Sequence, residues 1–330
     1  PPPFDMLRWL AANLLAVPSG ARQASYRVRP QGGAWREDPA WEQELSGDEA
    51  IAACKRLAEF VGAANQLVII TGAGISTSAG IPDYRGKAGS YRTGHQPVSH
   101  GDFTGKESAR QRYWQRSVVG FEMFNQSPPT PAHDVLTKWT RAGRVRRIIT
   151  QNVDGLHQRS GADCVTDLHG RIDRVICLKC KATSSRSSLQ GRLKEANEHF
   201  IERALQEGGK QQPDGDFQFD DECGGDFNVC TCSECGGILK PDVTFFGDNV
   251  PKDRVDMCMA DVNSADAVLV IGSTLSVYSA FRFVQHAARL EKPIAVVNLG
   301  ETRSERSGHP VLKINMKCDE AMVICDGLLK

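Results

Sequence analysis

The stretch Gln66-Leu-Val-Ile-Ile-Thr-Gly72-Ala-Gly74 decides the fold of this 330-residue chain. Its run of apolar residues predicts a buried strand, and the glycines that follow predict a tight turn where backbone can approach a ligand. The preceding residues 50–64 carry apolar side chains at helical spacing: Ile51, Cys54, Leu57, Ala58 and Val61. A helix, a buried strand and a glycine turn in this order indicate an α/β domain.

The same alternation recurs along the rest of the chain. Short apolar runs predict three more strands: Val145–Thr150, Ala267–Gly272 and Pro293–Asn298. Helical spacing predicts helices over 131–142, 251–264 and 278–290. Continuous apolar strands between helices are typical of a parallel sheet covered on both faces, so we predict a Rossmann-like, doubly wound α/β fold. Ligands bind such sheets at the carboxyl ends of the strands.

Composition gives no sign of a nucleic-acid partner or of a membrane span. The chain has 40 basic and 40 acidic residues, and this zero net charge gives no reason to expect nucleic acid as a partner. No run of about 18 apolar residues occurs, so no membrane span is expected.

Two cysteine pairs predict a metal site: Cys177-Leu-Lys-Cys180 and Cys232-Ser-Glu-Cys235. Each Cys-x-x-Cys turn places two thiolates beside an ion, and four thiolates complete the tetrahedron of a structural zinc. Cys230 is an alternative ligand, but Cys232 gives the usual spacing. The remaining seven of the eleven cysteines are irregularly spaced, which favours a reducing compartment over a disulfide scaffold.

Residues 171–240 interrupt the alternation of strands and helices and contain both cysteine pairs. We therefore predict a small zinc-binding module with a helical part, inserted between residues 46–170 and 241–330 of the Rossmann-like domain. Within the module, a helical pattern spans 188–206, and the polar segment Gly208–Phe227 is expected to be a long loop. Long loops in compact domains tend to be functional or mobile.

Residues 1–45 precede the predicted domain. Their positions 4–15 have the spacing of a short amphipathic helix, and no clear period follows. Termini are poorly ordered unless they are docked. We expect this N-terminal extension to be an arm that packs on its own domain or on a protein partner.

The turn Thr71-Gly72-Ala73-Gly74-Ile75-Ser76 predicts a nucleotide site. Glycines let the backbone approach a pyrophosphate, and a following helix offers free N–H groups to it. Thr77 stands where the dehydrogenase fingerprint requires Gly or Ala, and no acidic residue clearly ends the next strand. The pattern is compatible with a dinucleotide and does not support hydride transfer.

Further polar segments follow the glycine turn and the predicted strands. They are Gly80-Ile-Pro-Asp-Tyr-Arg85, Thr150-Gln-Asn-Val-Asp-Gly-Leu-His157, Leu168-His-Gly170, Gly272-Ser-Thr274 and Asn298-Leu-Gly300. Each alone could close a turn or cap a helix. Together they are expected to converge on one crevice at the carboxyl edge of the sheet.

In combination these motifs resemble those of the sirtuins, the NAD-dependent protein deacylases. The resemblance runs from about residue 50 to residue 328 and includes both cysteine pairs and the segment Lys240-Pro-Asp-Val-Thr-Phe-Phe-Gly-Asp248. The class II mitochondrial branch is the most similar, on the strength of Gln111-Arg-Tyr-Trp-Gln-Arg116, Pro213-Asp-Gly-Asp216 and Val277-Tyr-Ser279. The resemblance implies NAD and one structural zinc ion as cofactors and acyl-lysine proteins as substrates.

The resemblance also implies a mechanism. The acyl-lysine carbonyl oxygen attacks the ribose carbon that bears nicotinamide and forms an alkylimidate. His169 is then the general base that draws a proton from a ribose hydroxyl, a role that suits a side chain with a pKa near neutrality. Asn152 and Asp154 are implied to act beside the departing nicotinamide. The products are nicotinamide, free lysine and O-acyl-ADP-ribose.

Carried over residue by residue, the family's motifs imply two further groups of site residues. The implied cofactor contacts are Gly72, Ala73, Gly74, Ile75, Ser76, Ile81, Asp83, Tyr84, Arg85, Tyr91, Gln151, Asn152, Val153, Asp154, Gly272, Ser273, Thr274, Asn298, Leu299, Gly300 and Cys318. The implied substrate contacts are Tyr91, Arg92, Val243, Thr244, Phe245, Phe246, Gly247 and Val277. In the family the substrate backbone pairs as an added strand between two segments, which here are implied to be Thr244–Asp248 and Ser276–Ser279.

Two positions depart from the family pattern. Ala79 replaces the usual serine before Gly80, which costs at most one local hydrogen bond of about 1 kcal/mol. Members that remove succinyl groups carry a Tyr-x-x-Arg clamp, whereas here Tyr91 is followed directly by Arg92 and three residues on by Gly94. A carboxylate clamp depends on arginine placement, so we expect lipoyl, biotinyl or methylglutaryl-type groups instead.

Two other functions remain open from the sequence. One is mono-ADP-ribosyl transfer to a protein, and the other is a non-catalytic NAD-binding subunit of a larger assembly that docks through residues 1–45. Retention of His169 favours deacylation, because the role implied for it serves the acyl intermediate. The class II resemblance favours the mitochondrial matrix, with the bacterial cytoplasm as the alternative.

Overall fold

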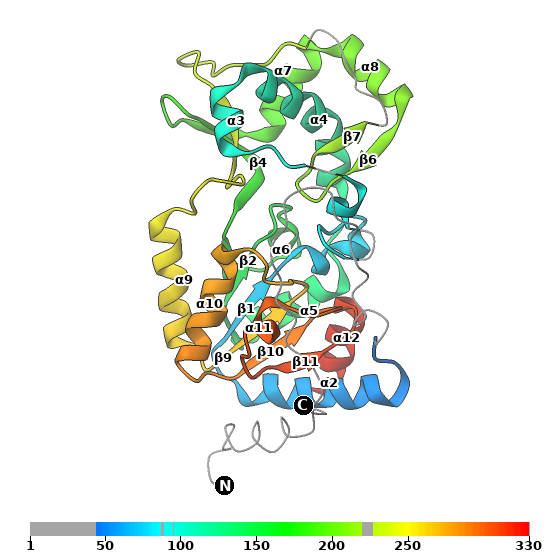
Figure 1. The fold of residues 1–330 in the computed structure, drawn as a ribbon, viewed down its shortest axis with the longest axis vertical. Coiled ribbons are helices and arrows are strands. Elements are labelled where there is room, and N and C mark those ends of the chain that lie inside the picture. The colour runs from blue at the N-terminus through cyan, green and yellow to red at the C-terminus, as the bar shows by residue number, and fades with distance from the viewer. Residues whose placement is uncertain (1–43, 87–88, 95, 220–226, 330) are drawn as a thin grey trace.

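The structure is a computed structural model that describes residues 44–86, 89–94, 96–219 and 227–329. The expected N-terminal arm therefore lies outside the described residues, apart from Glu44 and Leu45. The described chain forms two lobes. A large lobe contains the parallel sheet, and a small lobe above it contains α3, α4, α7 and α8 (Figure 1).

A six-stranded parallel sheet in the order β11-β10-β9-β1-β2-β3 forms the centre of the large lobe. Its strands are β1 (Leu67–Thr71), β2 (Val145–Thr150), β3 (Val165–Asp167), β9 (Ala267–Ile271), β10 (Ile294–Val297) and β11 (Leu312–Ile314). Every residue of β1, β9 and β10 is buried, as the unbroken apolar runs predict. The four predicted strands are confirmed, and β3 and β11 are additional short ones.

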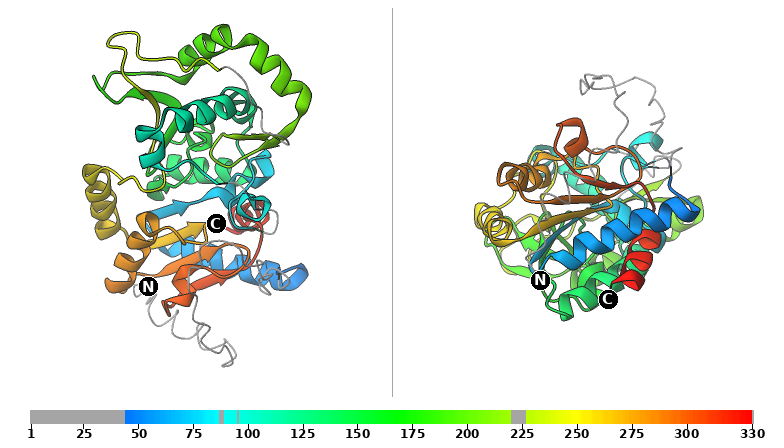
Figure 2. Two further views of the ribbon diagram at one scale, coloured as in Figure 1. Left: turned by 45° about the horizontal axis from the view of Figure 1, so that its top comes forward. Right: turned by 90° about the horizontal axis from the view of Figure 1, so that it is seen from below.

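Helices cover both faces of this sheet. One face packs against α2 (Gly47–Ala63), α5 (Pro131–Arg141) and α12 (Cys318–Leu328), with α2 beside α12 (Figure 2). The other face packs against α9 (Lys252–Ser264) and α10 (Tyr278–Arg289). The start of α5 follows from its sequence, because Thr130 caps the helix and Pro131 occupies its first turn. The predicted doubly wound α/β fold is confirmed.

The small lobe has its own core. An antiparallel sheet in the order β5-β4-β8 combines β4 (Gly170–Cys177), β5 (Thr183–Ser185) and β8 (Leu239–Val243). Around it lie α3 (His100–Gly105), α4 (Glu107–Gln126), α7 (Arg186–Ala196) and α8 (Glu198–Glu207). The fully buried Arg186 lies over the ring of Phe121, 4.5 Å from its centroid, and donates to Gln190 Oε1 and Ser117 O. These bonds satisfy much of a charge that would be costly to bury alone.

The polar segment in the middle of the chain is more regular than expected. The described part of Gly208–Phe227 is not simply a loop: β6 (Gly209–Gln211) and β7 (Phe217–Phe219) form a hairpin. The hairpin folds because Phe217 and Phe219 pack in the small-lobe core, where Phe219 contacts Phe200. The expected boundaries at 171–240 stay a prediction, and α3 and α4 from the preceding segment also pack in the small lobe.

Short elements complete the described chain: 3-10 helices at Ala73–Ile75, Thr77–Ala79 and Ser90–Thr93, and α-helical turns α6 (Leu156–Arg159) and α11 (Arg303–Arg306). Across the described ranges, no helix combines the length and the apolar character needed to cross a bilayer.

Candidate active site

A cavity of about 880 Å³ opens at the carboxyl ends of the parallel strands. Four residues that directly follow strands line it: Gly72 after β1, Gln151 after β2, Gly272 after β9 and Asn298 after β10. His169, two residues after β3, lines it as well. The small lobe adds Tyr113 from α4 and Val243 from the end of β8. The predicted polar strand ends therefore converge on one crevice.

Three glycines bring the ends of β1 and β9 into direct contact. A Cβ on Gly72 would lie 2.7 Å from Ser273 Cβ, and a Cβ on Gly74 would lie 2.8 Å from Gly272 Cα. Gly272 itself has φ +63°, a conformation that favours glycine. Because no side chain can fill this junction, the backbone of both turns forms a cradle that fits a pyrophosphate. The helix expected after the glycines is two short 3-10 helices instead.

His169 is held on both ring nitrogens. Nδ1 lies 3.0 Å from Gln151 O, and Nε2 lies 2.7 Å from Ser279 Oγ. A carbonyl oxygen can only accept, so the proton of the neutral ring sits on Nδ1 and the lone pair sits on Nε2. Burial lowers the pKa of His169 to about 4, partly opposed by the bond to Gln151. The imidazole is therefore neutral near pH 7 and can accept a proton at Nε2.

A hydrogen-bonded cluster lies at the end of β2. Asn152 Nδ2 donates to Ser76 Oγ and to Gly72 O, both at 3.1 Å, and Ser76 Oγ donates to Asp154 Oδ2 at 2.8 Å. Burial raises the pKa of Asp154, although bonds from Leu156 N and Ser76 oppose that rise. These contacts fix the orientations of the amide and the carboxyl group at the cavity wall.

Gln151 links the two glycine turns. Its Nε2 donates to Ser273 Oγ at 2.8 Å and to Thr71 O at 3.2 Å. The Gln151 side chain thus joins the ends of β1 and β9 while its own carbonyl orients His169.

The segment after the glycine turn forms an aromatic and cationic wall. The rings of Tyr84 and Tyr91 are 5.2 Å apart, and the Arg85 guanidinium lies 5.0 Å from the Tyr91 centroid. Asp83 Oδ1 accepts from Gly86 N at 2.7 Å, yet burial raises the pKa of Asp83. Asp83, Tyr84, Arg85 and Tyr91 all line the cavity.

Most of the residues implied by the family motifs line this cavity. Ile75, Arg92 and Gly300 do not. Ile75 is buried in the core beneath the turn, and Gly300 O accepts from Asn298 Nδ2 at 3.3 Å, so both support the wall from behind. The individual roles of the lining residues remain predictions.

One expected substrate edge, Thr244–Asp248, is attached to the cavity wall. Thr244 N donates to His169 O at 2.7 Å, and Phe246 O accepts from His100 N at 2.9 Å. The side chains differ in surroundings: Phe245 packs against Phe103 with ring centroids 5.2 Å apart, whereas Phe246 is 45% exposed. Phe246 is therefore the aromatic side chain of this edge that is accessible to a substrate.

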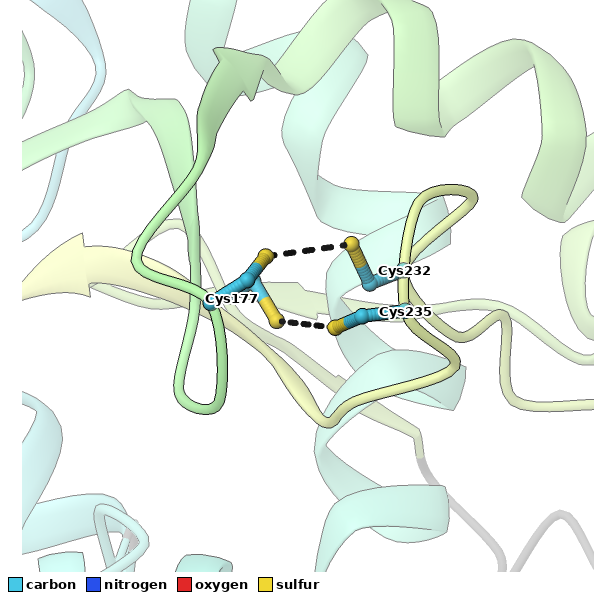
Figure 3. A group of neighbouring side chains, drawn as sticks. Cys177, Cys232 and Cys235 are labelled. Carbon is cyan, nitrogen blue, oxygen red and sulfur yellow. Dashed lines mark hydrogen bonds between the residues drawn. The ribbon is translucent and has the colours of Figure 1, made fainter.

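The four predicted metal ligands form one cluster, and Figure 3 labels three of them, Cys177, Cys232 and Cys235. Cys177 Sγ lies 3.5 Å from Cys235 Sγ, Cys180 Sγ lies 3.8 Å from Cys232 Sγ, and all four sulfurs lie within 4.8 Å of one another. A tetrahedral zinc about 2.3 Å from each sulfur sets the sulfurs about 3.8 Å apart. The cluster fits a zinc ion with no open position. Cys230 is not part of it.

Comparison with known proteins settles the family. The Sir2 family model matches residues 72–279. This chain belongs to the Sir2 family, the sirtuins. It is 44% identical over 274 residues to the human NAD-dependent protein lipoamidase sirtuin-4, mitochondrial, covering 82% of this chain and 85% of that protein. The prediction of a sirtuin is confirmed.

A bacterial relative is equally similar. NAD-dependent protein deacetylase 1 of Streptomyces coelicolor is 47% identical over 243 residues, covering 74% of this chain and 80% of the relative. A solved complex described as Sir2 with a p53 peptide and NAD+ superposes with a TM-score of 0.62 at 27% identity, covering 82% of this chain and 95% of the other. Sirtuins are NAD-dependent protein deacylases, so this sirtuin is an enzyme that uses NAD and holds a structural zinc.

Sequence reasoning missed several residues of this sirtuin's cavity. Ser279 was seen only as part of a motif, and its bond to His169 joins positions 110 residues apart. Asp214 and Asp216, from the turn of the β6–β7 hairpin, reach the cavity wall, and Asp216 pairs with Arg116 at 3.6 Å. Arg282 also lines the cavity. The motif Pro213-Asp-Gly-Asp216 indicated the class II branch of the family, but it did not predict that these aspartates reach the cavity.

Two buried histidines beneath the glycine turn predict acid sensitivity. The rings of His133 and His157 lie 4.6 Å apart, and burial lowers the pKa of His133 to about 3 and that of His157 well below its usual value. The unfolded chain takes up protons near pH 6.5 and the folded chain does not. The free energy of unfolding is therefore expected to fall below that pH by up to about 1.4 kcal/mol per pH unit for each histidine.

Urea unfolding at pH 7, 6 and 5 measures this slope. His157→Gln, which can still bond to Thr71 Oγ1, is the matched variant and is expected to show a shallower slope. An equal slope in both proteins would refute the assignment.

Proposed function

We propose that this sirtuin removes bulky acyl groups, such as lipoyl and biotinyl, from lysine side chains of proteins. NAD-dependent protein deacylation is the activity of the family, and the acyl preference and the residue roles are the new elements. The observation that carries the proposal is the cavity of about 880 Å³, which combines the glycine cradle, a neutral His169 and acidic side chains in its wall. The sirtuin-4 relative, whose name states lipoamidase activity, supports the preference.

His169 is the proposed general base. Bound NAD supplies the ribose carbon from which nicotinamide departs and the ribose hydroxyls beside it. In the proposed step, His169 Nε2 accepts a proton from one of these hydroxyls. Ser279 Oγ lies 2.7 Å from Nε2, so an oxygen atom can be held within hydrogen-bond distance of this nitrogen. Gln151 O fixes the tautomer that leaves Nε2 free to accept the proton.

Asn152 and Asp154 are proposed to hold the nicotinamide end of NAD. The bonds through Ser76 keep both side chains in one orientation, which favours a single pose of the carboxamide. The cradle of Gly72, Gly74 and Gly272 is proposed to receive the pyrophosphate.

The wall of the cavity favours an uncharged acyl group. Asp214 and Asp216 line it, and burial, followed by the charge of Asp214, raises the pKa of Asp216 well above its usual value. The raised pKa means that this wall disfavours negative charge, so a succinyl or malonyl carboxylate is disfavoured beside it as well. The walls of Tyr84 and Tyr113 offer apolar surface to a lipoyl or biotinyl chain.

A panel of one peptide with five different acyl groups on its lysine tests this preference. We expect kcat/KM for lipoyl-lysine and biotinyl-lysine to exceed that for succinyl-lysine by about tenfold or more, with acetyl-lysine and methylglutaryl-lysine completing the series. Asp214→Asn with Asp216→Asn is expected to raise succinyl turnover selectively. The preference is wrong if succinyl-lysine is the best substrate of the unaltered enzyme.

The two alternative functions gain no support from the described residues. The motive for a non-catalytic subunit lies in residues 1–45, almost all outside the described ranges. The presence of His169 favours deacylation over ADP-ribosyl transfer, because the task proposed for this base serves the acyl intermediate. The relatives include a mitochondrial and a bacterial protein, so the mitochondrial matrix stays a prediction.

A further inference from the structure

A basic and aromatic group lies at the rim of the cavity, on the second expected substrate edge. Tyr278, the first residue of α10, is 54% exposed. The guanidinium of Arg282 lies 5.2 Å from its ring centroid, and that of Arg303 lies 5.8 Å from it. Tyr278 and Arg282 both line the cavity. An exposed aromatic ring beside two guanidinium groups is a surface that favours an anionic partner.

Arg282 has no acidic partner among the described residues, unlike many arginines of this protein. Arg116, Arg146 and Arg171, for example, each pair with an aspartate. Arg282 Nε is buried from solvent and makes no hydrogen bond within the described chain. Because Nε is closed off from solvent, a ligand carboxylate would bind the Nη groups of Arg282, and it would balance a charge that has no ion pair among the described residues.

Arg303 has a different task at the same rim. Its Nη1 donates to Ser276 O at 3.1 Å, and its guanidinium lies 4.5 Å from the centroid of Phe281. These contacts hold the edge 276–279 in place. Arg282 is therefore the cation of the pair that is available to a substrate.

The position of this group relative to the catalytic histidine defines what it can contact. Ser279, which bonds to His169 Nε2, directly follows Tyr278 and precedes Arg282 by less than one helical turn. An acyl group that reaches His169 brings its peptide past this rim. Residues beside the acyl-lysine would then lie near Arg282, outside the acyl pocket.

We propose that Arg282, with Tyr278, forms a subsite for an acidic side chain of the protein substrate beside the acyl-lysine. The proposal rests on the proposed function, because it places the acyl-lysine at His169. The ligand class is a glutamate or aspartate carboxylate, bound by the guanidinium of Arg282. Family substrate pairing through backbone gives affinity with little sequence selection, and this subsite adds selection by charge.

Fluorescence anisotropy with labelled nine-residue peptides tests the subsite without turnover. Three peptides share a central lipoyl-lysine and carry Glu, Gln or Arg at the two positions on each side. The unaltered protein is expected to bind the Glu peptide about fivefold or more tightly than the Gln peptide and the Arg peptide most weakly. Arg282→Glu is expected to reverse this order. Arg282→Lys keeps the charge and is expected to retain part of the preference.

Arg289→Glu is the matched control, because it makes the same charge change on an exposed residue of the same helix. It is expected to leave the Glu preference intact. The proposal fails if Arg282→Glu keeps the order of the unaltered protein, if Arg289→Glu loses it equally, or if the unaltered protein shows no preference. Turnover of the Gln peptide with NAD reports on the proposed function separately.

Discussion

His169→Ala is expected to lower the rate of acyl removal by about a thousandfold while leaving the fold intact. General bases contribute about 10² to 10⁴ in rate, and this one accepts its proton at an Nε2 that is oriented from both sides. A neutral imidazole near pH 7 is ready to act without first losing a proton, because burial lowers its pKa to about 4. Single-turnover assays with a lipoyl-lysine peptide measure the loss.

Three controls separate loss of the base from loss of structure. The variant should keep its zinc, its unfolding midpoint and its affinity for NAD. Ser279→Ala removes only the hydroxyl that contacts Nε2, and its rate is expected to fall much less, by about tenfold or below. If His169→Ala retains more than a few per cent of the activity, another group is the base.

Cys232→Ser is expected to cost the protein its zinc and at least about 4 kcal/mol of unfolding free energy, because the loss of a structural metal is among the most destabilising changes. The cluster joins the turn after β4 to the segment before β8, and Cys232 is one of its four ligands. Without the ion, three thiols and a serine hydroxyl remain, and the two turns lose the link that the metal provides between them. Metal analysis and chemical unfolding measure both effects.

Cys230→Ser is the matched control for this prediction. It removes a thiol only two residues away that lies partly buried in the small-lobe core and outside the cluster. Zinc content should stay at one ion per chain, with only a small change in stability. A zinc-loaded, stable Cys232→Ser protein together with a zinc-free Cys230→Ser protein would exchange the two assignments.

The centre of the main sheet was predictable because its strands β1, β9 and β10 are short, continuous and fully buried. The run Leu67–Thr71 has no polar face, so only a sheet covered on both sides can accept it. The strands Val165–Asp167 and Leu312–Ile314 were missed because three residues are too few to show a period. The hairpin in Gly208–Phe227 was missed because its stability comes from packing against distant helices.

The site was predictable where chemistry follows a strand end directly. Gly72, Gln151 and Asn298 reach the cavity for that reason. Contacts that depend on tertiary packing could not be predicted from the sequence. They are the bond from Ser279 to His169 and the positions of Asp214, Asp216 and Arg282 at the cavity. The family motif likewise could not tell that Arg92 lies away from the cavity lining.

Mass spectrometry of the products formed from NAD and one lipoyl-lysine peptide tests the central claim most directly. The account predicts nicotinamide, unmodified peptide and O-lipoyl-ADP-ribose in equal amounts, with none formed when NAD is omitted. Nicotinamide release that leaves the lipoyl group on the peptide and attaches ADP-ribose to protein would contradict it.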